Sequence, residues 1–314
     1  MLSIVIPVFN EDESIQNLHK EILLIVPNLG EGYEIIFVDD GSTDKSFEIL
    51  KEIQKKNEKV RLFSFRKNQG KSEALTFGFK KAKGDYIVTL DSDLQDKPSE
   101  IPKLMKKLKE GYDLACGWRV ERRDSFLKIL SSKIFNSLAS FLWGLKLHDY
   151  NCGQKVYTSG AAKSLRLYGG MHRFIPLLAY KNGFKVCEVP VIHGKRKFGK
   201  SKYGFSKLWK DIPDIFTMLF ISKYGKRPLH FFGTVGGILL MLGVVILVYL
   251  TMLWFQGYSI GRRPLLFLGM LLVISGFQVF FTGFLADLII NLFQQSKNYN
   301  GEEETTLLKY STDT

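Results

Sequence analysis

Short apolar runs alternate with amphipathic stretches along the first part of the chain. Five runs have the length and the β-branched content of buried strands: LSIVIPVF, YEIIFVDD, VRLFSF, DYIVTLD and YDLACGW. Between them, apolar positions recur at helical spacing over residues 13–27, 43–57, 70–82 and 98–109. This alternation predicts an α/β fold, in which helices cover both faces of a mostly parallel sheet.

Carboxylates collect at the ends of these strands. Ligands of parallel α/β sheets bind at the carboxyl ends of the strands, and several aspartates fall at that edge: Asp39, Asp40, Asp91 and Asp93. Asp12 and Ser42 are suited to cap the helices that follow them, and Pro98 suits the first turn of another. The sequence therefore predicts a polar site at this edge of the sheet.

Two long apolar runs follow the α/β region. Residues 228–255 and 264–293 each exceed the ~20 residues needed to cross a bilayer, and we expect two transmembrane helices within 228–294. Small residues offer close helix packing and include a GxxxG motif: Gly233, Gly236, Gly237 and Gly243. A buried hairpin of a soluble protein is the weaker alternative, because runs this long and uncharged are rare there.

Charges near the apolar runs give opposite indications of orientation. Lys223, Lys226 and Arg227 flank the first run and place the α/β region in the cytoplasm, whereas Arg262 and Arg263 lie in the connecting loop. The chain opens on an apolar strand, without the basic segment and cleavage site of a signal peptide. We therefore expect an integral membrane protein whose α/β domain is cytoplasmic.

Two amphipathic segments with basic flanks lie outside the expected strands. Residues 125–147 and 205–227 suit a core helix and an interfacial helix equally well. The expected organisation is an α/β domain over 1–204, a juxtamembrane helix over 205–227, the two spans, and a disordered polar tail over 295–314.

The net charge of +13 belongs essentially to the part of the chain before the apolar runs. Basic surfaces bind nucleic acid, anionic lipid or phosphorylated substrates, and the neighbouring apolar runs favour the last two. With 46% apolar and 24% charged residues, the 314-residue chain is not of the disordered class. Cys116, Cys152 and Cys187 have no paired spacing, which suits a reducing compartment.

Three aspartates crowd the stretch VTLDSDLQD: Asp91, Asp93 and Asp96. An EF-hand loop starting at Asp91 would need glycine and glutamate where Asp96 and Pro102 stand, which excludes that motif. D-x-D spacing at a strand end places two carboxylates on one side, where Mg²⁺ or Mn²⁺ shared with phosphate oxygens fits. Asp96, followed by Lys97 and Pro98, is expected to start a helix rather than to bind metal.

The stretch GKRKFGKS, residues 194–201, matches the phosphate-loop pattern G-x4-G-K-[ST]. Such a loop functions between a strand and a helix inside a parallel sheet, whereas this one follows the expected sheet and carries bulky residues. We interpret it as a basic loop for a phosphate or a lipid headgroup.

Four motifs resemble, in this order, the family 2 glycosyltransferases with the GT-A fold: IVIPVFNE, VDDGSTD, NQGKSEAL and DSDLQD. The resemblance covers residues 1–205. DYNCGQKVY, GKSKY and the two terminal spans narrow it to the polyprenyl-phosphate glycosyltransferases, which include dolichol-phosphate mannose synthases and bacterial enzymes acting on undecaprenyl phosphate. The chain lacks the Q-x-x-R-W motif of processive synthases, which counts against a polysaccharide polymerase.

The resemblance implies a nucleotide-sugar site at the strand ends. Asp91 and Asp93, with Gln95, would hold Mg²⁺ or Mn²⁺ against the donor diphosphate. The residues implied in nucleotide binding are Pro7, Phe9, Glu11, Asp39, Asp40, Gly70, Lys71 and Ser92. Lys71 is also consistent with a solvated helix lysine, and Asp44 with a helix cap as much as with a ligand.

The implied acceptor is a polyprenyl phosphate, whose charged oxygen needs positioning more than a base. Two basic clusters beside the amphipathic segments suit its headgroup: Arg119, Arg122, Arg123, Lys128 and Ser132 in one, Arg196, Lys200 and Lys202 in the other. Each also suits a solvated charge. Asp149 matches the family's catalytic-region aspartate, as an orienting group or base, or else caps a loop. His148 and Cys152 are interpreted as structural.

Together these features predict a membrane-anchored inverting glycosyltransferase that moves one sugar from a nucleotide diphosphate to a polyprenyl phosphate on the cytoplasmic leaflet. RVERRD resembles the bacterial glucosyl- and aminoarabinose-type branch of the family more than the mannose branch. This resemblance implies a UDP donor and undecaprenyl phosphate rather than a GDP-mannose-dependent synthase, and we expect a bacterial inner membrane. The alternative from another class is an inactive lipid-binding scaffold, against which the intact D-S-D-L-Q counts. We expect no nucleic-acid partner, and a homo-oligomer stays open.

Overall fold

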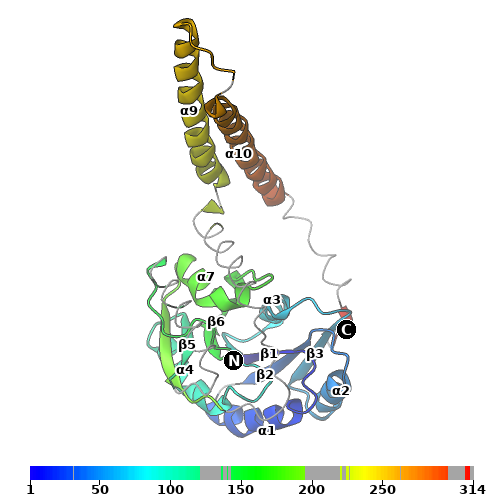
Figure 1. Ribbon diagram of the computed structural model, residues 1–314. Helices are drawn as coiled ribbons and strands as arrows, with labels where there is room; N and C mark the ends of the chain where they lie inside the picture. The colour runs from blue at the N-terminus through cyan, green and yellow to red at the C-terminus, as the bar shows by residue number, and fades with distance from the viewer. Residues whose placement is uncertain are drawn as a thin grey trace. The chain divides into compact units, whose positions relative to one another are not determined.

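The computed structural model describes residues 1–30, 32–120, 136, 140, 143–194, 220, 224–225, 227–261, 263–295 and, for the backbone alone, 308–311. The chain divides into two compact units, residues 1–214 with 303–314 and residues 215–302. The first unit contains an α/β sheet and the second a helical hairpin (Figure 1).

One mixed sheet forms the framework of the first unit. Its strands are β1 (Leu2–Val8), β2 (Tyr33–Asp39), β3 (Val60–Phe65), β4 (Tyr86–Thr89), β5 (Leu114–Arg119), β6 (Lys155–Thr158), β7 (Val186–Val191) and β8 (Leu308–Ser311). They lie in the order β7-β5-β6-β4-β1-β2-β3-β8. β1 to β5 and β7 run in one direction, whereas β6 and β8 run in the other. The predicted α/β fold with a mostly parallel sheet is confirmed.

Helices cover both faces of this sheet. They are α1 (Ile15–Ile25), α2 (Ser46–Lys56), α3 (Lys71–Lys81), α4 (Ile101–Lys109), α6 (Ser159–Ser164) and α7 (Ile175–Lys181), with the 3₁₀ turns η1 (Val26–Leu29), η2 (Pro98–Glu100) and η3 (Met171–Phe174). Successive residues of β1 face opposite layers. Ile4 packs in a core cluster with Leu18 of α1, while Val5 lies against Gly78 of α3. Figure 1 shows α3 on the other side of the sheet from α1 and α2.

Expectations about several element ends are wrong. Ser42 does not cap α2, because its Oγ accepts a hydrogen bond from the Asn10 N–H at 3.0 Å. Asp44 holds the start of α2 instead, since its Oδ1 accepts from the Ser46 N–H at 2.9 Å. Asp12 is not the cap of α1 either, whose N-cap residue is Ser14.

The tail and the region after β5 also differ from prediction. Part of the tail expected to be disordered forms β8, which pairs antiparallel with the edge strand β3. β6 inserts antiparallel between β4 and β5, an arrangement that no apolar run had indicated. The amphipathic segments 125–147 and 205–227 lie largely outside the described residues.

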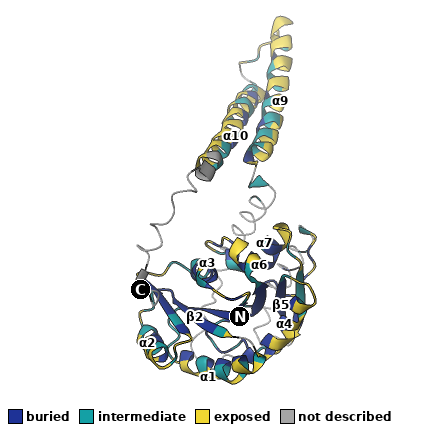
Figure 2. Cartoon of the chain, turned by 180° about the vertical axis from the view of Figure 1, so that it is seen from behind, coloured by how far each residue is buried: buried dark blue, intermediate teal, exposed yellow. Residues whose placement is uncertain are grey.

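The second unit is a hairpin of α9 (Pro228–Phe255) and α10 (Pro264–Gln295). Both helices are long and apolar enough to cross a membrane, with mean hydropathies of 2.6 and 2.2 over their spans. Only 11% of the apolar 18-residue stretch that defines each span is buried, and exposed apolar residues recur along both helices, which are largely yellow in Figure 2. This exposure distinguishes them from core helices of a soluble protein.

Glycines bring α9 and α10 into close contact, but they are not those of the GxxxG motif. A Cβ at Gly276 would lie 2.6 Å from Leu240 N and 2.8 Å from Gly236 O, and one at Gly243 would lie 2.9 Å from Gly269 O. In contrast, a Cβ at Gly237 would have no neighbour within 4 Å among the described residues. The hairpin therefore packs through Gly236 and Gly243 of α9 rather than through Gly237.

Candidate active site

The turn after β4 carries the D-x-D carboxylates. Oδ1 of Asp93 accepts a hydrogen bond from the Gln95 N–H at 3.2 Å. Between them, Leu94 has a φ of 62°, which is unfavourable for a residue with a Cβ. Its side chain is only 4% exposed and packs in the core cluster. The buried leucine therefore holds the turn in a strained conformation that fixes the polar residues on either side.

Gln95 connects this turn to the segment after β7. Gln95 O accepts a hydrogen bond from Gly194 N at 2.8 Å, and Gln95 Nε2 lies 3.4 Å from Gly194 O, to which it donates. Because Nε2 is engaged there, Oε1 is the amide atom suited to face a cation.

Asp91 forms an ion pair with a lysine of helix α3. Lys71 is the first residue of α3, and its Nζ lies 2.5 Å from Oδ1 of Asp91. The Asp91 side chain is partly exposed, and its partial burial opposes ionisation, but the attraction of Lys71 outweighs this effect and lowers the pKa of the carboxyl. Asp91 is therefore an anion at neutral pH. Gly70, which precedes the helix, has a φ of 106°, a conformation that favours glycine.

Gly153 permits two carboxylates to approach the same backbone. A Cβ at this position would lie 2.5 Å from Cγ of Asp91 and 2.6 Å from Oδ2 of Asp96. The sequence predicted that Asp96 starts a helix, and this prediction is wrong. It is 3% exposed, and its Oδ2 accepts from the Asp91 N–H at 3.3 Å. Its Oδ1 lies 3.6 Å from Nδ1 of His193.

His172 lines a cavity together with Lys71, Asp91 and the buried Lys155. Nδ1 of His172 lies 3.1 Å from Oγ of Ser72. Burial, with the positive charges of Lys71 and Arg173, lowers the pKa of His172 to about 3. The imidazole is therefore neutral at physiological pH.

Asp39 and Asp40 support the loops at the strand edge. Asp39 is 1% exposed and accepts from Ser64 Oγ at 2.6 Å and from Ser42 N at 3.1 Å. Asp40 accepts from the N–H groups of Gln69 at 2.7 Å and Gly70 at 2.9 Å. Burial outweighs these bonds and raises the pKa of Asp40. A role of either carboxylate in binding a nucleotide base stays a prediction.

The remaining nucleotide-site candidates lie at the same edge. Pro7 is buried within β1, and Phe9 and Glu11 follow it, half-buried. The carbonyl oxygen of Ser92 accepts from Ser14 Oγ at 2.6 Å, which joins the start of α1 to the D-x-D turn. These residues are close to the carboxylates in the fold, and their contact with a nucleotide stays a prediction.

Arg119, at the end of β5, forms a bidentate pair with Asp149. Its Nε donates to Oδ2 at 2.6 Å and its Nη2 to Oδ1 at 3.0 Å. The Asp149 side chain is 1% exposed. Burial alone would lower the pKa of Arg119, but Asp149 outweighs it and raises this pKa. Because both Asp149 oxygens are engaged, the geometry favours an orienting role for Asp149 over that of a base.

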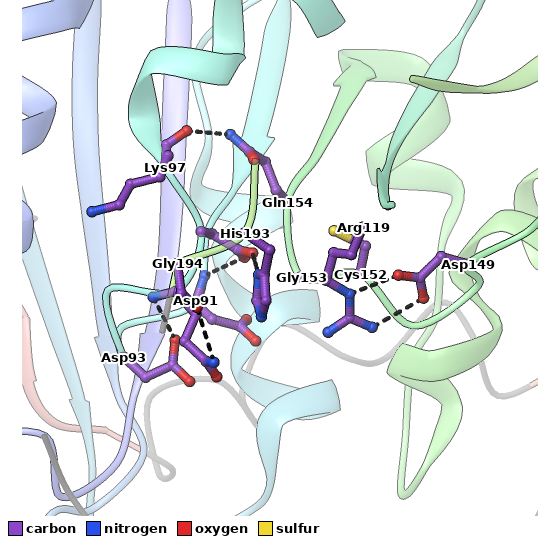
Figure 3. A network of polar contacts seen from close by, with 12 residues as sticks. Asp91, Asp93, Lys97, Arg119, Asp149, Cys152, Gly153, Gln154, His193 and Gly194 are labelled. Atoms are coloured by element: carbon purple, nitrogen blue, oxygen red, sulfur yellow. Dashed lines mark hydrogen bonds and ion pairs between the residues drawn. The ribbon is translucent and has the colours of Figure 1, made fainter. Parts of the chain in front are cut away.

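Figure 3 shows the Arg119–Asp149 pair and the D-x-D aspartates, with Cys152 and Gly153 between them. The pair is therefore connected to the aspartates through one short segment, residues 149–153. The other predicted acceptor-phosphate residues lie outside the described residues: Arg122, Arg123, Lys128, Ser132, Arg196, Lys200 and Lys202.

Sequence reasoning missed three residues of this site: Gly153, Asp96 and His172. Gly153 stands in the recognised motif DYNCGQKVY, and its glycine was the available signal. Asp96 was set aside because Pro98 follows it closely. His172 lies far along the chain, and no pattern in the sequence connects it to Asp91.

The oxygen atoms of this turn fit a divalent cation. Mg²⁺ and Mn²⁺ prefer carboxylate and carbonyl oxygens, which Asp91, Asp93 and Gln95 supply. Within the described ranges, no cluster of three His, Cys, Asp or Glu side chains is arranged to hold a metal by itself. A cation here would need further oxygens, such as those of a diphosphate.

Comparisons with known proteins identify the family of the chain. The sequence model of glycosyl transferase family 2 matches residues 3–166. The dodecaprenyl-phosphate galacturonate synthase of Rhizobium johnstonii is 36% identical over 307 residues, which cover 95% of this chain and 91% of that protein. The undecaprenyl-phosphate 4-deoxy-4-formamido-L-arabinose transferase of Edwardsiella ictaluri is 37% identical over 248 residues, 79% of this chain and 76% of that one.

Solved structures share the fold at low identity. Glucosyl-3-phosphoglycerate synthase of Mycobacterium tuberculosis, in complex with Mn²⁺ and UDP-glucose, is 20% identical, with a TM-score of 0.54 over 71% of this chain and 78% of that one. This similarity supports the GT-A fold of the first unit. The family match and the two relatives go further, and on that evidence this chain is a glycosyltransferase that belongs to glycosyl transferase family 2.

Proposed function

We propose that this enzyme moves one sugar from a nucleotide diphosphate sugar to a polyprenyl phosphate on the cytoplasmic leaflet of a bacterial inner membrane. The observation that carries the proposal is the placement of acidic and basic side chains on opposite sides of Gly153. Figure 3 shows the carboxylates of Asp91 and Asp93 on one side of Gly153 and the guanidinium of Arg119, paired with Asp149, on the other. The names of the two relatives, both polyprenyl-phosphate sugar transferases, support the same acceptor class.

The donor side uses the D-x-D turn. A Mg²⁺ or Mn²⁺ ion held by Asp91, Asp93 and Gln95 would neutralise the charge that develops on the departing nucleotide diphosphate. Lys71 and the N-terminus of α3 lie beside Asp91 and suit the same phosphates. Asp39, Asp40, Pro7, Phe9 and Glu11 would surround the base and ribose, and UDP is the donor nucleotide that we favour.

The acceptor side uses the Arg119–Asp149 pair. The pair engages Nε and Nη2 of Arg119, and a guanidinium carries further N–H donors on Nη1 that suit a phosphate oxygen. Asp149 fixes the plane of the guanidinium. A phosphate oxygen is already anionic, so it needs no base to activate it. Holding this oxygen near the anomeric carbon would therefore supply the catalysis.

The hairpin suits a membrane anchor on the same enzyme. α9 and α10 would cross the bilayer and return the chain to its starting side. β8, which follows α10 in the chain, belongs to the sheet of the first unit, as such a return requires. We accordingly place the glycosyltransferase domain over residues 1–204 and the membrane-spanning part over 228–294.

Thermal unfolding with a panel of nucleotide sugars tests the donor side. We expect UDP-sugars together with Mn²⁺ to raise the unfolding temperature of the full chain in detergent micelles, and Asp93→Asn to abolish the shift. Stabilisation by GDP-mannose alone would replace the UDP donor by GDP-mannose. Stabilisation by none of the nucleotide sugars would favour the inactive lipid-binding scaffold and contradict the proposal.

A further inference from the structure

Lys71 occupies an oxygen that the proposed metal site would need. Its Nζ lies 2.5 Å from Oδ1 of Asp91, and the two side chains are 34% and 35% exposed. Lys155, which is 3% exposed, lines the same cavity and adds a second positive charge. In the ligand-free protein, Asp91 is thus already neutralised by lysines of the chain itself.

The space beside Asp91 leaves few positions for another cation. A Cβ at Gly153 would lie 2.6 Å from Oδ1, so the backbone covers that side of the carboxylate. A divalent cation bound to the same oxygen as Lys71 would face the ammonium at short range, where like charges repel. Binding of the metal to Asp91 therefore favours movement of Lys71 away from it.

The surrounding contacts allow the side chain of Lys71 to move while its backbone stays. Ser72 Oγ donates to Gly169 O at 2.7 Å, and Oε1 of Glu73 accepts from Gly169 N at 3.1 Å. These bonds anchor the first turn of α3. The lysine stem itself is flexible, and a partly exposed ion pair costs little to break.

We propose that Lys71 couples metal binding to donor binding. In the ligand-free enzyme its ammonium occupies Oδ1 of Asp91 and keeps the affinity for a lone divalent cation low. When a diphosphate enters, Lys71 transfers to a phosphate oxygen and leaves the carboxylate to the metal. Metal and nucleotide thus bind together rather than separately. This inference rests on the proposed function, because it requires a diphosphate-bearing donor.

Mn²⁺ titration of the full chain in detergent micelles tests the coupling, with the free ion measured by electron paramagnetic resonance. In the absence of nucleotide, Lys71→Met should bind Mn²⁺ about tenfold more tightly than the unaltered protein, a change of about 1.4 kcal/mol. UDP should strengthen Mn²⁺ binding strongly in the unaltered protein and only weakly in the variant. Lys71→Arg, which keeps the positive charge, should behave like the unaltered protein.

Lys80→Met is the matched control, because Lys80 is an exposed residue of the same helix and its loss removes the same charge. Lys71→Gln serves as a second uncharged variant if Lys71→Met does not fold by circular dichroism. Unchanged Mn²⁺ affinity in a folded, nucleotide-free uncharged variant would overturn the coupling role. Failure of the unaltered protein to bind UDP or GDP at saturating Mn²⁺ would instead contradict the proposed function. The nucleotide-free titration does not depend on this binding, so the two failures can be distinguished.

Discussion

The absence of a side chain at Gly153 determines how close Asp91 and Asp96 lie. A Cβ there would lie 2.5–2.6 Å from atoms of both carboxylates, below any ordinary contact distance. Gly153→Ala should therefore displace Asp91 while leaving the core intact. We expect sugar transfer to fall by about 10²-fold, the loss typical of a displacement of about 1 Å in a catalytic group, and Mn²⁺ binding with UDP to weaken.

Gly160→Ala is the control for this substitution, because a Cβ at Gly160 would have no neighbour within 4 Å among the described residues. Transfer rate and unfolding temperature are measured for both variants. Gly153→Ala activity equal to that of the control would show that the close approach has no part in the reaction.

His172 gives the enzyme a predictable response to acid. Its pKa is about 3 in the folded protein, against an ordinary value of 6.5. Between these values the unfolded chain takes up a proton that the folded protein does not. The stability that His172 contributes is therefore complete above pH 6.5 and is lost as the pH falls toward 3.

His172→Asn, which keeps a polar group near Ser72, should remove this contribution. We expect the unaltered protein to lose up to about 2 kcal/mol more stability than the variant between about pH 7 and about pH 5, at about 1.4 kcal/mol per pKa unit. Chemical denaturation at the two pH values measures the difference. An identical loss in both proteins would show that His172 is protonated equally in the folded and unfolded states.

The candidate site could be predicted in part from single residues. Asp91 and Asp93 were identified because carboxylates at a strand end are a local pattern, and Asp149 because it stands in a recognised motif. The bidentate Arg119–Asp149 pair was not foreseen, since the two residues are 30 positions apart and meet only through β5 and β6. Asp96 was misassigned because the rule for helix starts was applied without knowledge of the turn before it.

At the scale of elements, the glycines of the hairpin offer a direct test. Gly276→Leu would place a side chain where Leu240 N and Gly236 O now lie within 3 Å of a Cβ position. Overpacking of this kind costs about 1–3 kcal/mol. We expect faster hydrogen exchange in α9 and α10, measured by mass spectrometry, because the helices can no longer approach so closely.

Gly237→Leu makes the same change on α9 at a position where a Cβ would meet no described neighbour within 4 Å. This control should leave hydrogen exchange of both helices unchanged. Equal effects of the two substitutions would contradict the observed helix contact.

Elements with strong periodicity were predictable, and elements defined by partners were not. β1 to β5 and α1 to α4 follow from apolar runs and helical spacing, which are local properties of the sequence. β6 is a short strand whose place depends on pairing with both β4 and β5. β8 has only four residues, too few for a reliable pattern in the sequence, and its place depends on pairing with the open edge of β3.

At the scale of the whole molecule, the proposed function divides the task of a lipid-linked transfer between the two units. The sheet unit would position a water-soluble donor and the phosphate that attacks it. The hairpin unit is long and apolar enough to cross the membrane that would hold the polyprenyl chain. Composition alone predicted this division, because residues 228–294 contain very few charges while the preceding part carries the positive excess.

The central claim is transfer of a sugar to a lipid phosphate at the Asp91–Asp93 site. The most direct measurement is mass spectrometry of the lipid fraction after the full chain is incubated with undecaprenyl phosphate, Mn²⁺ and a panel of UDP- and GDP-sugars. We predict a glycosyl undecaprenyl phosphate that disappears with Asp93→Asn and persists with Asp85→Asn, an exposed aspartate at the opposite end of β4. No lipid product with any donor, or undiminished product with Asp93→Asn, would contradict the account.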